Sequence, residues 1–201
     1  KYTFTNESVL KLAIDLESLC KVLKCLRNDD IITIKYDEDS SQISWIFQNE
    51  DSKNFRKFDL NLIDTDMVSE FNAPNRDSFD CKIRLFSHNF LDICKDLTQI
   101  GDNIKILSYQ ENNNNIIEFN VEGDIGNGLI KLYPDDTVKI DSTNDCNGKY
   151  SLKYLNIFSK SNTFSNRVNI YMENEKPIAL KYKINKGLLG SIVFHLAPKN
   201  D

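Results

Sequence analysis

The feature that most constrains the fold of this 201-residue chain is a pattern that recurs three times: a helix-like run, a strand, a polar turn and a second strand. In the first copy the helix-like run spans 16–26, and strand-like runs at 31–36 and 42–48 flank a turn at 37–41. The apolar face of this helix is predicted from the spacing of Leu16, Leu19, Leu23 and Leu26. Such a repeat predicts a fold in which one supersecondary unit is used several times.

The second and third copies keep the same order of elements. The second helix is expected to begin at Ser87 as its N-cap and to stop at Gly101, with strands at 103–109 and 116–121 around a polar turn. Its apolar face is expected to hold Phe90, Ile93, Leu97 and Ile100. The third copy has a less regular helix-like run at 151–161, a strand at 167–172, a turn at 173–176 and a return strand at 177–184.

Lysines accompany the apolar stripe in all three copies and lie on the opposite side of each expected helix. A charged helix face is most often only solvated, and this is the preferred interpretation for any single helix. Three copies with the same arrangement favour a second interpretation, because repeats related by rotation would line one concave surface with lysine. Such a surface would meet phosphates without reading bases. The lysines are Lys21, Lys24, Lys95, Lys153 and Lys160.

Composition excludes several other classes of protein. The formal net charge of -5 means that any contact with nucleic acid must come from a local basic surface. No run approaches the roughly 20 apolar residues that span a bilayer. The five cysteines include no C-x-x-C pair, and their odd number argues against a disulfide framework or a zinc site. Buried, reduced thiols in a cytosolic or nuclear protein are the preferred interpretation.

Evidence for catalysis is weak. The only histidines are His88 and His195, and no nucleophile is placed with a base and an orienting group. Paired acids fall in expected turns or linkers, where carboxylates are usually solvated. We therefore predict no catalytic residues, no metal site and no cofactor. An unrelated α+β enzyme stays as a hypothesis that an active-site cluster would have to support.

Short motifs then give a family resemblance that runs nearly the whole length of the chain. In order and spacing they resemble segments of eukaryotic sliding clamps of the proliferating cell nuclear antigen family. A nucleotide-binding loop is the alternative interpretation of the Gly-Asn-Gly segment. It is disfavoured because no helix follows the segment. The motifs are 23–25 (Leu-Lys-Cys), 30–33 (Asp-Ile-Ile-Thr), 93–97 (Ile-Cys-Lys-Asp-Leu), 100–102 (Ile-Gly-Asp), 126–132 (Gly-Asn-Gly-Leu-Ile-Lys-Leu), 154–158 (Tyr-Leu-Asn-Ile-Phe) and 196–199 (Leu-Ala-Pro-Lys).

The resemblance implies an α+β DNA-clamp fold with two similar domains of antiparallel sheets and helices on the inner face of a ring. It implies that residues 1–62 are the remainder of an N-terminal clamp domain, that 63–79 are an interdomain connecting loop, and that 80–201 are a C-terminal clamp domain. A family subunit has four such helices, and three are recognised here. We therefore expect the first domain to be incomplete in this chain.

Site residues follow from the same resemblance. The five lysines named above would face DNA. Edge strands would join neighbouring subunits, with contacts at Phe58, Leu60, Gly126, Gly128 and Ile130. A partner-binding groove would be built from the connecting loop and the C-terminal tail. Phe71 and His195 depart from the family pattern there, which puts the fine specificity of the groove in doubt. The groove residues are Phe71, Ala73, Pro74, Pro177, His195, Ala197 and Pro198.

The resemblance implies a nuclear, non-enzymatic homotrimer that encircles double-stranded DNA without sequence preference. It would act as a processivity factor and as a docking platform in DNA replication and repair. Expected partners are DNA polymerase, the clamp loader and other proteins with a motif of glutamine, an aliphatic residue and two aromatics. The alternative is a subunit of a checkpoint-type heterotrimeric clamp. Self-complementary edge strands and the linker groove favour the homotrimer.

Overall fold

The computed structural model describes residues 11–49, 51, 53–64 and 79–199, and the chain divides into two compact units, 1–72 and 73–201. We call them unit 1 and unit 2. Each is an antiparallel α+β structure, as the sequence predicts. Among the residues described, none of the helices has the length and apolar character that crossing a bilayer requires.

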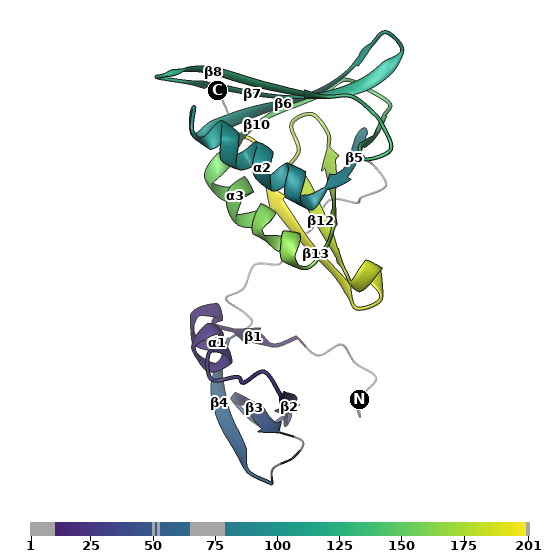
Figure 1. Cartoon of the computed structure of the whole chain (residues 1–201). Helices are drawn as coiled ribbons and strands as arrows, with labels where there is room; N and C mark the ends of the chain where they lie inside the picture. Colours follow the sequence, from purple (N-terminus) through teal and green to yellow (C-terminus); the bar gives the residue numbers. More distant parts are fainter. Residues whose placement is uncertain (1–10, 50, 52, 65–78, 200–201) are drawn as a thin grey trace. The chain divides into compact units, whose positions relative to one another are not determined.

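Unit 1 is a four-stranded antiparallel sheet with one helix (Figure 1). The strand order is β1 (Ala13–Ile14), β4 (Phe55–Ile63), β3 (Gln42–Asn49) and β2 (Asp30–Tyr36), and α1 spans Leu16–Leu23. Alternation along β3 places Ile43, Trp45 and Phe47 in the core, where Phe47 is fully buried. Val22 of α1 packs on the same cluster.

Local chemistry fixes both ends of α1. The Asp15 carboxylate accepts from the backbone N–H of Ser18 at 2.7 Å and so caps the N-terminus of the helix. After the helix, Asp30 accepts from the N–H of Arg27 at 2.7 Å and from the guanidinium of Arg56 on β4. The same guanidinium donates to the carbonyl of Cys25 at 2.7 Å. The segment between α1 and β2 is thereby tied to β4.

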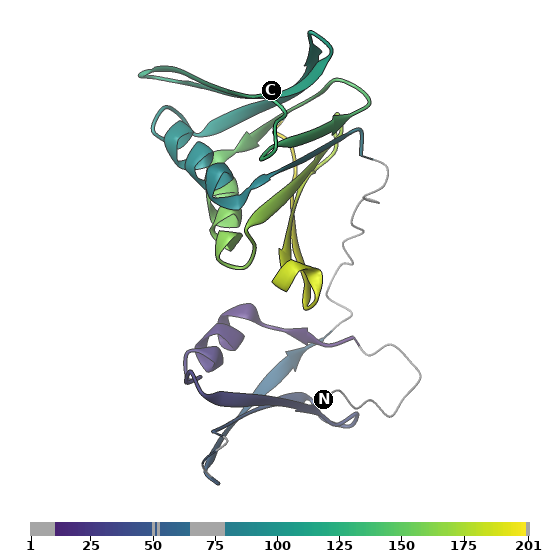
Figure 2. The same ribbon diagram turned by 45° about the vertical axis from the view of Figure 1, so that its right-hand side comes forward.

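Unit 2 contains two antiparallel sheets and two long helices (Figures 1 and 2). One sheet has the order β10 (Cys146–Ser151), β6 (Asn103–Glu111), β7 (Asn114–Gly123), β8 (Gly126–Leu132). The other has the order β13 (Gly190–Leu196), β12 (Ile178–Ile184), β11 (Arg167–Met172), β5 (Cys81–Phe86), β9 (Lys139–Ser142). The helices are α2 (Ser87–Thr98) and α3 (Leu152–Ser159), and two short 3-10 turns are η3 (Lys160–Thr163) and η4 (Asn185–Gly187).

The internal repeat is longer than the sequence pattern predicts. In unit 2 a short strand, a helix and three antiparallel strands occur twice, as β5-α2-β6-β7-β8 and β10-α3-β11-β12-β13. The strand before each helix pairs within the other half: β5 joins β11, and β10 joins β6. This exchange ties the two halves into one unit around a shared core.

That core takes side chains from both sheets and both helices. Ile104, Phe119, Leu85, Ile170 and Leu180 belong to five different strands and are all fully buried. Burying a side chain of this size contributes about 1.5–3 kcal/mol relative to leaving it exposed. The core therefore fixes which faces of the sheets and helices remain outward, and the functional surfaces are those outward faces.

Two sequence predictions about helix details are wrong. Ser87 is the first residue of α2 and does not cap it; Phe86 holds the N-cap position, and the Ser87 hydroxyl donates to the Ser165 carbonyl at 2.6 Å. In unit 1 only Leu19 of the four leucines packs against the core, because α1 ends at Leu23 and Leu16 is 73% exposed. Val22 is the buried residue of this helix instead.

Candidate nucleic-acid interface

Helices α2 and α3 lie side by side and present one helical surface of unit 2 (Figures 1 and 2). Their inner sides are buried, with Phe90, Leu97 and Leu155 at most 3% exposed. The amide nitrogen of Asn156 on α3 donates to the Thr98 hydroxyl on α2 at 2.6 Å. This packing fixes the spacing of the side chains that point away from the core.

Three of the predicted lysines stand on this surface, which we call the helix face: Lys95 on α2, Lys153 on α3 and Lys160 at the start of η3. All three are exposed, and none has a carboxylate within 4 Å among the residues that the structure describes. The acids of α2, Asp92 and Asp96, are also exposed. The helix face thus offers separated, mobile cations that can compensate phosphates without a fixed geometry.

Unit 1 places the other two predicted lysines on α1. Lys21 forms an i,i+4 ion pair with Glu17 at 2.9 Å, and both side chains are largely exposed. Surface pairs of this kind are weak and are screened by salt, so Lys21 can exchange Glu17 for another anion. Lys24 is exposed at the C-cap of the helix.

Strand β8, one of the predicted subunit contacts, lies at the edge of its sheet and pairs only with β7. The side chain of Ile130 packs against the core of unit 2, while Leu129 is 60% exposed. What β8 offers another chain is therefore its row of backbone N–H and C=O groups together with the alternate, outward side chains.

The two predicted interface glycines of β8 have different physical roles. A Cβ at Gly128 would lie 2.9 Å from Cδ2 of Leu97, so this glycine is needed for packing of β8 on its own helix α2. Gly126 has φ of 143°, a conformation that side chains rarely adopt, and a Cβ there would meet nothing within 4 Å.

Strand β4 holds the other predicted contact residues. Phe58 and Leu60 pack on the core of unit 1, and the Phe58 ring lies 5.5 Å from the ring of Phe47. β1 pairs with β4 only at Leu62 and Ile63, so the described edge from 55 to 61 has no strand beside it opposite β3. As in β8, the groups available for pairing are those of the backbone.

The predicted partner groove is only partly within the described residues. Phe71, Ala73 and Pro74 lie outside them. Pro177 precedes β12, and Ile178 of that strand pairs with Leu196 of β13, which brings Pro177 beside the tail at Ala197. His195 pairs with Ala179 in the same ladder and is half-buried. The tail then runs toward β10, where the N–H of Lys199 donates to the Lys149 carbonyl at 2.8 Å.

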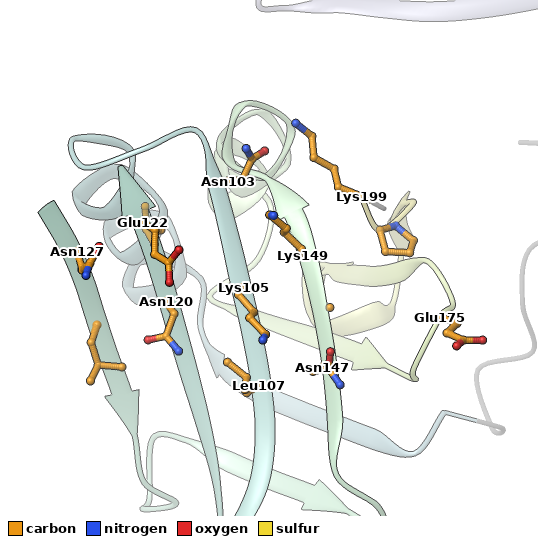
Figure 3. Close-up of a pocket in the computed structure, with 15 residues that line it drawn as sticks. Asn103, Lys105, Leu107, Asn120, Glu122, Asn127, Asn147, Lys149, Glu175 and Lys199 are labelled. Atoms are coloured by element: carbon orange, nitrogen blue, oxygen red, sulfur yellow. The ribbon is translucent and has the colours of Figure 1, made fainter. Parts of the chain in front are cut away.

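Pro198 lines a cavity of about 1100 Å³ that sequence reasoning did not find (Figure 3). The cavity lies over the outward side of sheet β10-β6-β7-β8, where Lys149 and Lys105 stand opposite each other on adjacent strands. Alternation along β6 was the available signal, because Lys105 stands between the buried residues Ile104 and Ile106. Glu122, Glu175 and several asparagines complete the lining, so its charge is mixed.

Further along the same outward side, Lys131 forms ion pairs with two glutamates, and these are part of a hydrogen-bonded network. Glu118 accepts from the Asn120 amide at 2.6 Å and from the Tyr109 hydroxyl at 2.8 Å. Lys131 lies 3.6 Å from Glu118 and 3.4 Å from Glu111. These hydrogen bonds, with that of Asn120 as the largest contribution, hold the pKa of Glu118 below its ordinary value. This side of the sheet is therefore a poor match for phosphates.

Within the described part of the chain, no three His, Cys, Asp or Glu side chains are grouped so that they could hold a metal ion. Comparison with protein families gives two matches. A model of the proliferating cell nuclear antigen N-terminal domain matches residues 2–71, and a model of the C-terminal domain of the same protein matches residues 74–199.

Proposed function

The chain belongs to the proliferating cell nuclear antigen family of sliding clamps, and on this basis we propose that three identical copies encircle duplex DNA. In this proposal the assembly acts in the nucleus as a processivity factor and docking platform for replication and repair proteins. The family is non-enzymatic, and we propose that this chain has no catalytic activity either.

The observation that carries the DNA-binding part is the helix face. Lys95, Lys153 and Lys160 come from helices that pack side by side, and they are exposed without an ion-pair partner among the described residues. A protein that must move along DNA benefits from contacts that are individually weak and geometrically permissive, because no single contact holds it in place. Lys21 and Lys24 of α1 would add to the same function.

The test is the salt dependence of duplex binding by a chain with Lys95→Gln, Lys153→Gln and Lys160→Gln. Each phosphate contact contributes about 0.9 to the slope of log K against log salt, so losing three contacts per chain should lower the slope by about 3 for one chain and by about 8 for a ring of three. The matched control removes three exposed lysines elsewhere, with Lys35→Gln, Lys53→Gln and Lys105→Gln. Equal slopes for the two variants would refute a DNA-binding role for the helix face.

Assembly is tested separately by light scattering on the complete gene product. A homotrimer has three times the mass of one subunit and forms from one chain, whereas a checkpoint-type subunit stays monomeric until other chains are added. The backbone edges of β4 and β8 support the homotrimer, because among the described residues each strand is paired on one side only, β4 by β3 up to residue 61 and β8 by β7 throughout. A monomer at micromolar concentration would favour the heterotrimeric alternative.

The docking role is tested by calorimetric titration with a peptide that carries glutamine, an aliphatic residue and two aromatics. A second peptide with both aromatics replaced by alanine is the control. We expect binding of the intact peptide only, weakened by His195→Ala, because His195 and Pro177 stand at the same end of the β12–β13 ladder. Equal behaviour of both peptides would remove the docking role.

A further inference from the structure

A second cavity, of about 540 Å³, lies on the outward side of sheet β13-β12-β11-β5-β9. Its lining includes four cationic side chains and, within the described part of the chain, no carboxylate. We call it the basic pocket and define it by Arg84, Arg167, Lys183, Lys186, Asn169 and Phe164. All of these residues belong to unit 2.

Strand register brings together cations that are far apart in the sequence. On β5, Arg84 stands between the buried residues Ile83 and Leu85 and points outward, and it pairs with Asn169 of β11. Val168 of β11 pairs with Tyr182 of β12, which makes Arg167 and Lys183 neighbours on the outward side.

The turn η4 completes the pocket from the end of β12. Its residues Asn185 and Lys186 have positive φ of 47° and 57°. This conformation is uncommon for residues other than glycine, and it brings Lys186 into the lining of the cavity.

Folding alone does not favour this arrangement of charge. Arg84 lies directly opposite Lys139 of β9, and like charges in that position destabilise a sheet; an exposed ion pair of Lys139 with Asp136 at 4.0 Å offsets this only in part. In the cavity of Figure 3, by contrast, Lys105 and Lys149 share the lining with Glu122 and Glu175. Among the described residues, Arg84, Lys183 and Lys186 form no ion pair, and concentrated positive charge of this kind is what an anionic ligand requires.

The remaining lining residues indicate which anion. Phe164 is 54% exposed at the pocket, where its ring is free to stack on a planar group. Asn169 and Asn185 add side-chain amides, which can donate to and accept from the edges of a base. Bases in a duplex are stacked inside the helix, but those of a single strand can turn toward an aromatic side chain. A purely acidic peptide would leave Phe164 and the amides unused.

We propose that the basic pocket binds a segment of single-stranded nucleic acid, with Arg84, Lys183 and Lys186 contacting phosphates and Phe164 stacking on a base. Arg167 shapes the pocket wall, because its guanidinium lies 3.6 Å from the centre of the Phe86 ring and donates to the Thr137 carbonyl. The site lies on a sheet and is separate from the helix face. It does not depend on ring closure.

The experiment measures fluorescence anisotropy of a labelled oligothymidylate of about 10 nucleotides, a length within the site sizes of single-strand binders. The reference protein is the complete chain with Lys95→Gln, Lys153→Gln and Lys160→Gln, so that the helix face contributes little. Adding Arg84→Gln, Lys183→Gln and Lys186→Gln should weaken binding at least tenfold. It should also lower the salt slope by about 2, since each single-strand phosphate contact contributes about 0.7.

Two controls separate the pocket from general charge and from misfolding. Lys35→Gln, Lys53→Gln and Lys105→Gln, added to the same reference, remove equal charge elsewhere and should weaken binding by less than threefold. Phe164→Ala should weaken it at least fivefold, the lower end of what stacking one base contributes, and Phe164→Tyr should retain it. Melting temperatures of the pocket variant should be unchanged or higher, because repulsion between cations is removed.

Three outcomes would overturn the proposal. Equal weakening by the pocket and control substitutions would mean that only overall charge matters. Sensitivity to the cations but not to Phe164, with displacement of the oligonucleotide by poly-glutamate at similar concentration, would assign the pocket to an acidic peptide. Equal binding of a duplex with no effect of Phe164→Ala would show that no base is recognised.

Discussion

Replacing Gly128 by alanine tests why β8 carries glycine at a predicted subunit contact. The added Cβ would lie 2.9 Å from Cδ2 of Leu97 and 3.4 Å from Cγ1 of Ile100, both in the same unit. The Leu97 side chain can shift, so the strain falls at the lower part of the roughly 1–3 kcal/mol that overpacking costs. Lower entropy of the unfolded chain offsets about 0.4–1 kcal/mol. We expect a net loss of about 1 kcal/mol.

For a unit of this size, a loss of about 1 kcal/mol lowers the melting temperature by roughly 3–5 °C. The two units can be followed separately, since Trp45, the single tryptophan of the chain, lies in unit 1. The Gly128→Ala variant should have a lower melting temperature for unit 2, followed by circular dichroism and by the absorbance of the tyrosines, most of which lie in that unit. The midpoint of Trp45 fluorescence should stay where it is.

A double-mutant cycle makes the reasoning sharper. Leu97→Val removes the atom that the new Cβ would meet. The double variant should therefore be about 1 kcal/mol more stable than the sum of the two single effects predicts. Gly123→Ala serves as a comparison in which a larger loss of stability is expected. Its Cβ would lie 1.8 Å from the carbonyl oxygen of Ile100, a backbone atom that cannot move away alone. Additive effects in the cycle, or an unchanged transition for Gly128→Ala in the monomer, would refute intramolecular packing as the reason for glycine at 128.

Three further predictions concern the rest of the chain. Thiol titration of the native protein near pH 8 should modify the exposed Cys20 and Cys25 and spare the three buried cysteines. Burial protects these thiols and raises the pKa of Cys94 to about 12. Rapid modification of all five cysteines would contradict the fold of unit 2. The backbone N–H of Arg27 and the Arg56 guanidinium lower the pKa of Asp30. The ionised Asp30 carboxylate therefore stabilises folded unit 1 above about pH 4, and this stabilisation is lost as the pH falls further. Asp30→Asn should therefore lower the denaturation midpoint of Trp45 fluorescence at pH 7 and much less at pH 3. Asn156→Ala should speed amide exchange in α3 and cost about 1 kcal/mol, because it removes the bond to Thr98; unchanged exchange would mean that packing alone holds α3.

Strand positions were predictable because alternation is a local property. The strand expected at 167–172 from the residue pattern has the observed bounds of β11, and the strand at 126–132, which the family resemblance implied, has those of β8. Each of these runs ends where turn-forming residues begin, so neighbouring sequence was sufficient. The hairpin between β6 and β7 was predicted too wide: its turn is only Asn112 and Asn113, both with positive φ.

Features that depend on distant partners were not predictable. The eight residues of α1 are too few to fix the phase of an apolar stripe, and the sheet selects Val22 as the buried residue. Ser87 has the side chain of a good N-cap, but its hydroxyl bonds to Ser165, 78 residues away. Arg84 and Lys183 reach the same pocket only because β11 lies between β5 and β12. Strand order of this kind has no signal in the local sequence.

The two cationic surfaces of unit 2 differ in a way that predicts different ligands. On the helix face, long lysine side chains stand apart on α2 and α3 beside Asp92 and Asp96, so the field is weak and no geometry is preferred. The basic pocket is concave, includes two arginines and has an aromatic ring in its wall. The Arg84 guanidinium can bind a phosphate through two parallel hydrogen bonds of defined geometry, whereas the ammonium groups of the helix face act as point charges. The helix face therefore suits a duplex that moves past it, and the basic pocket suits a strand that stays bound.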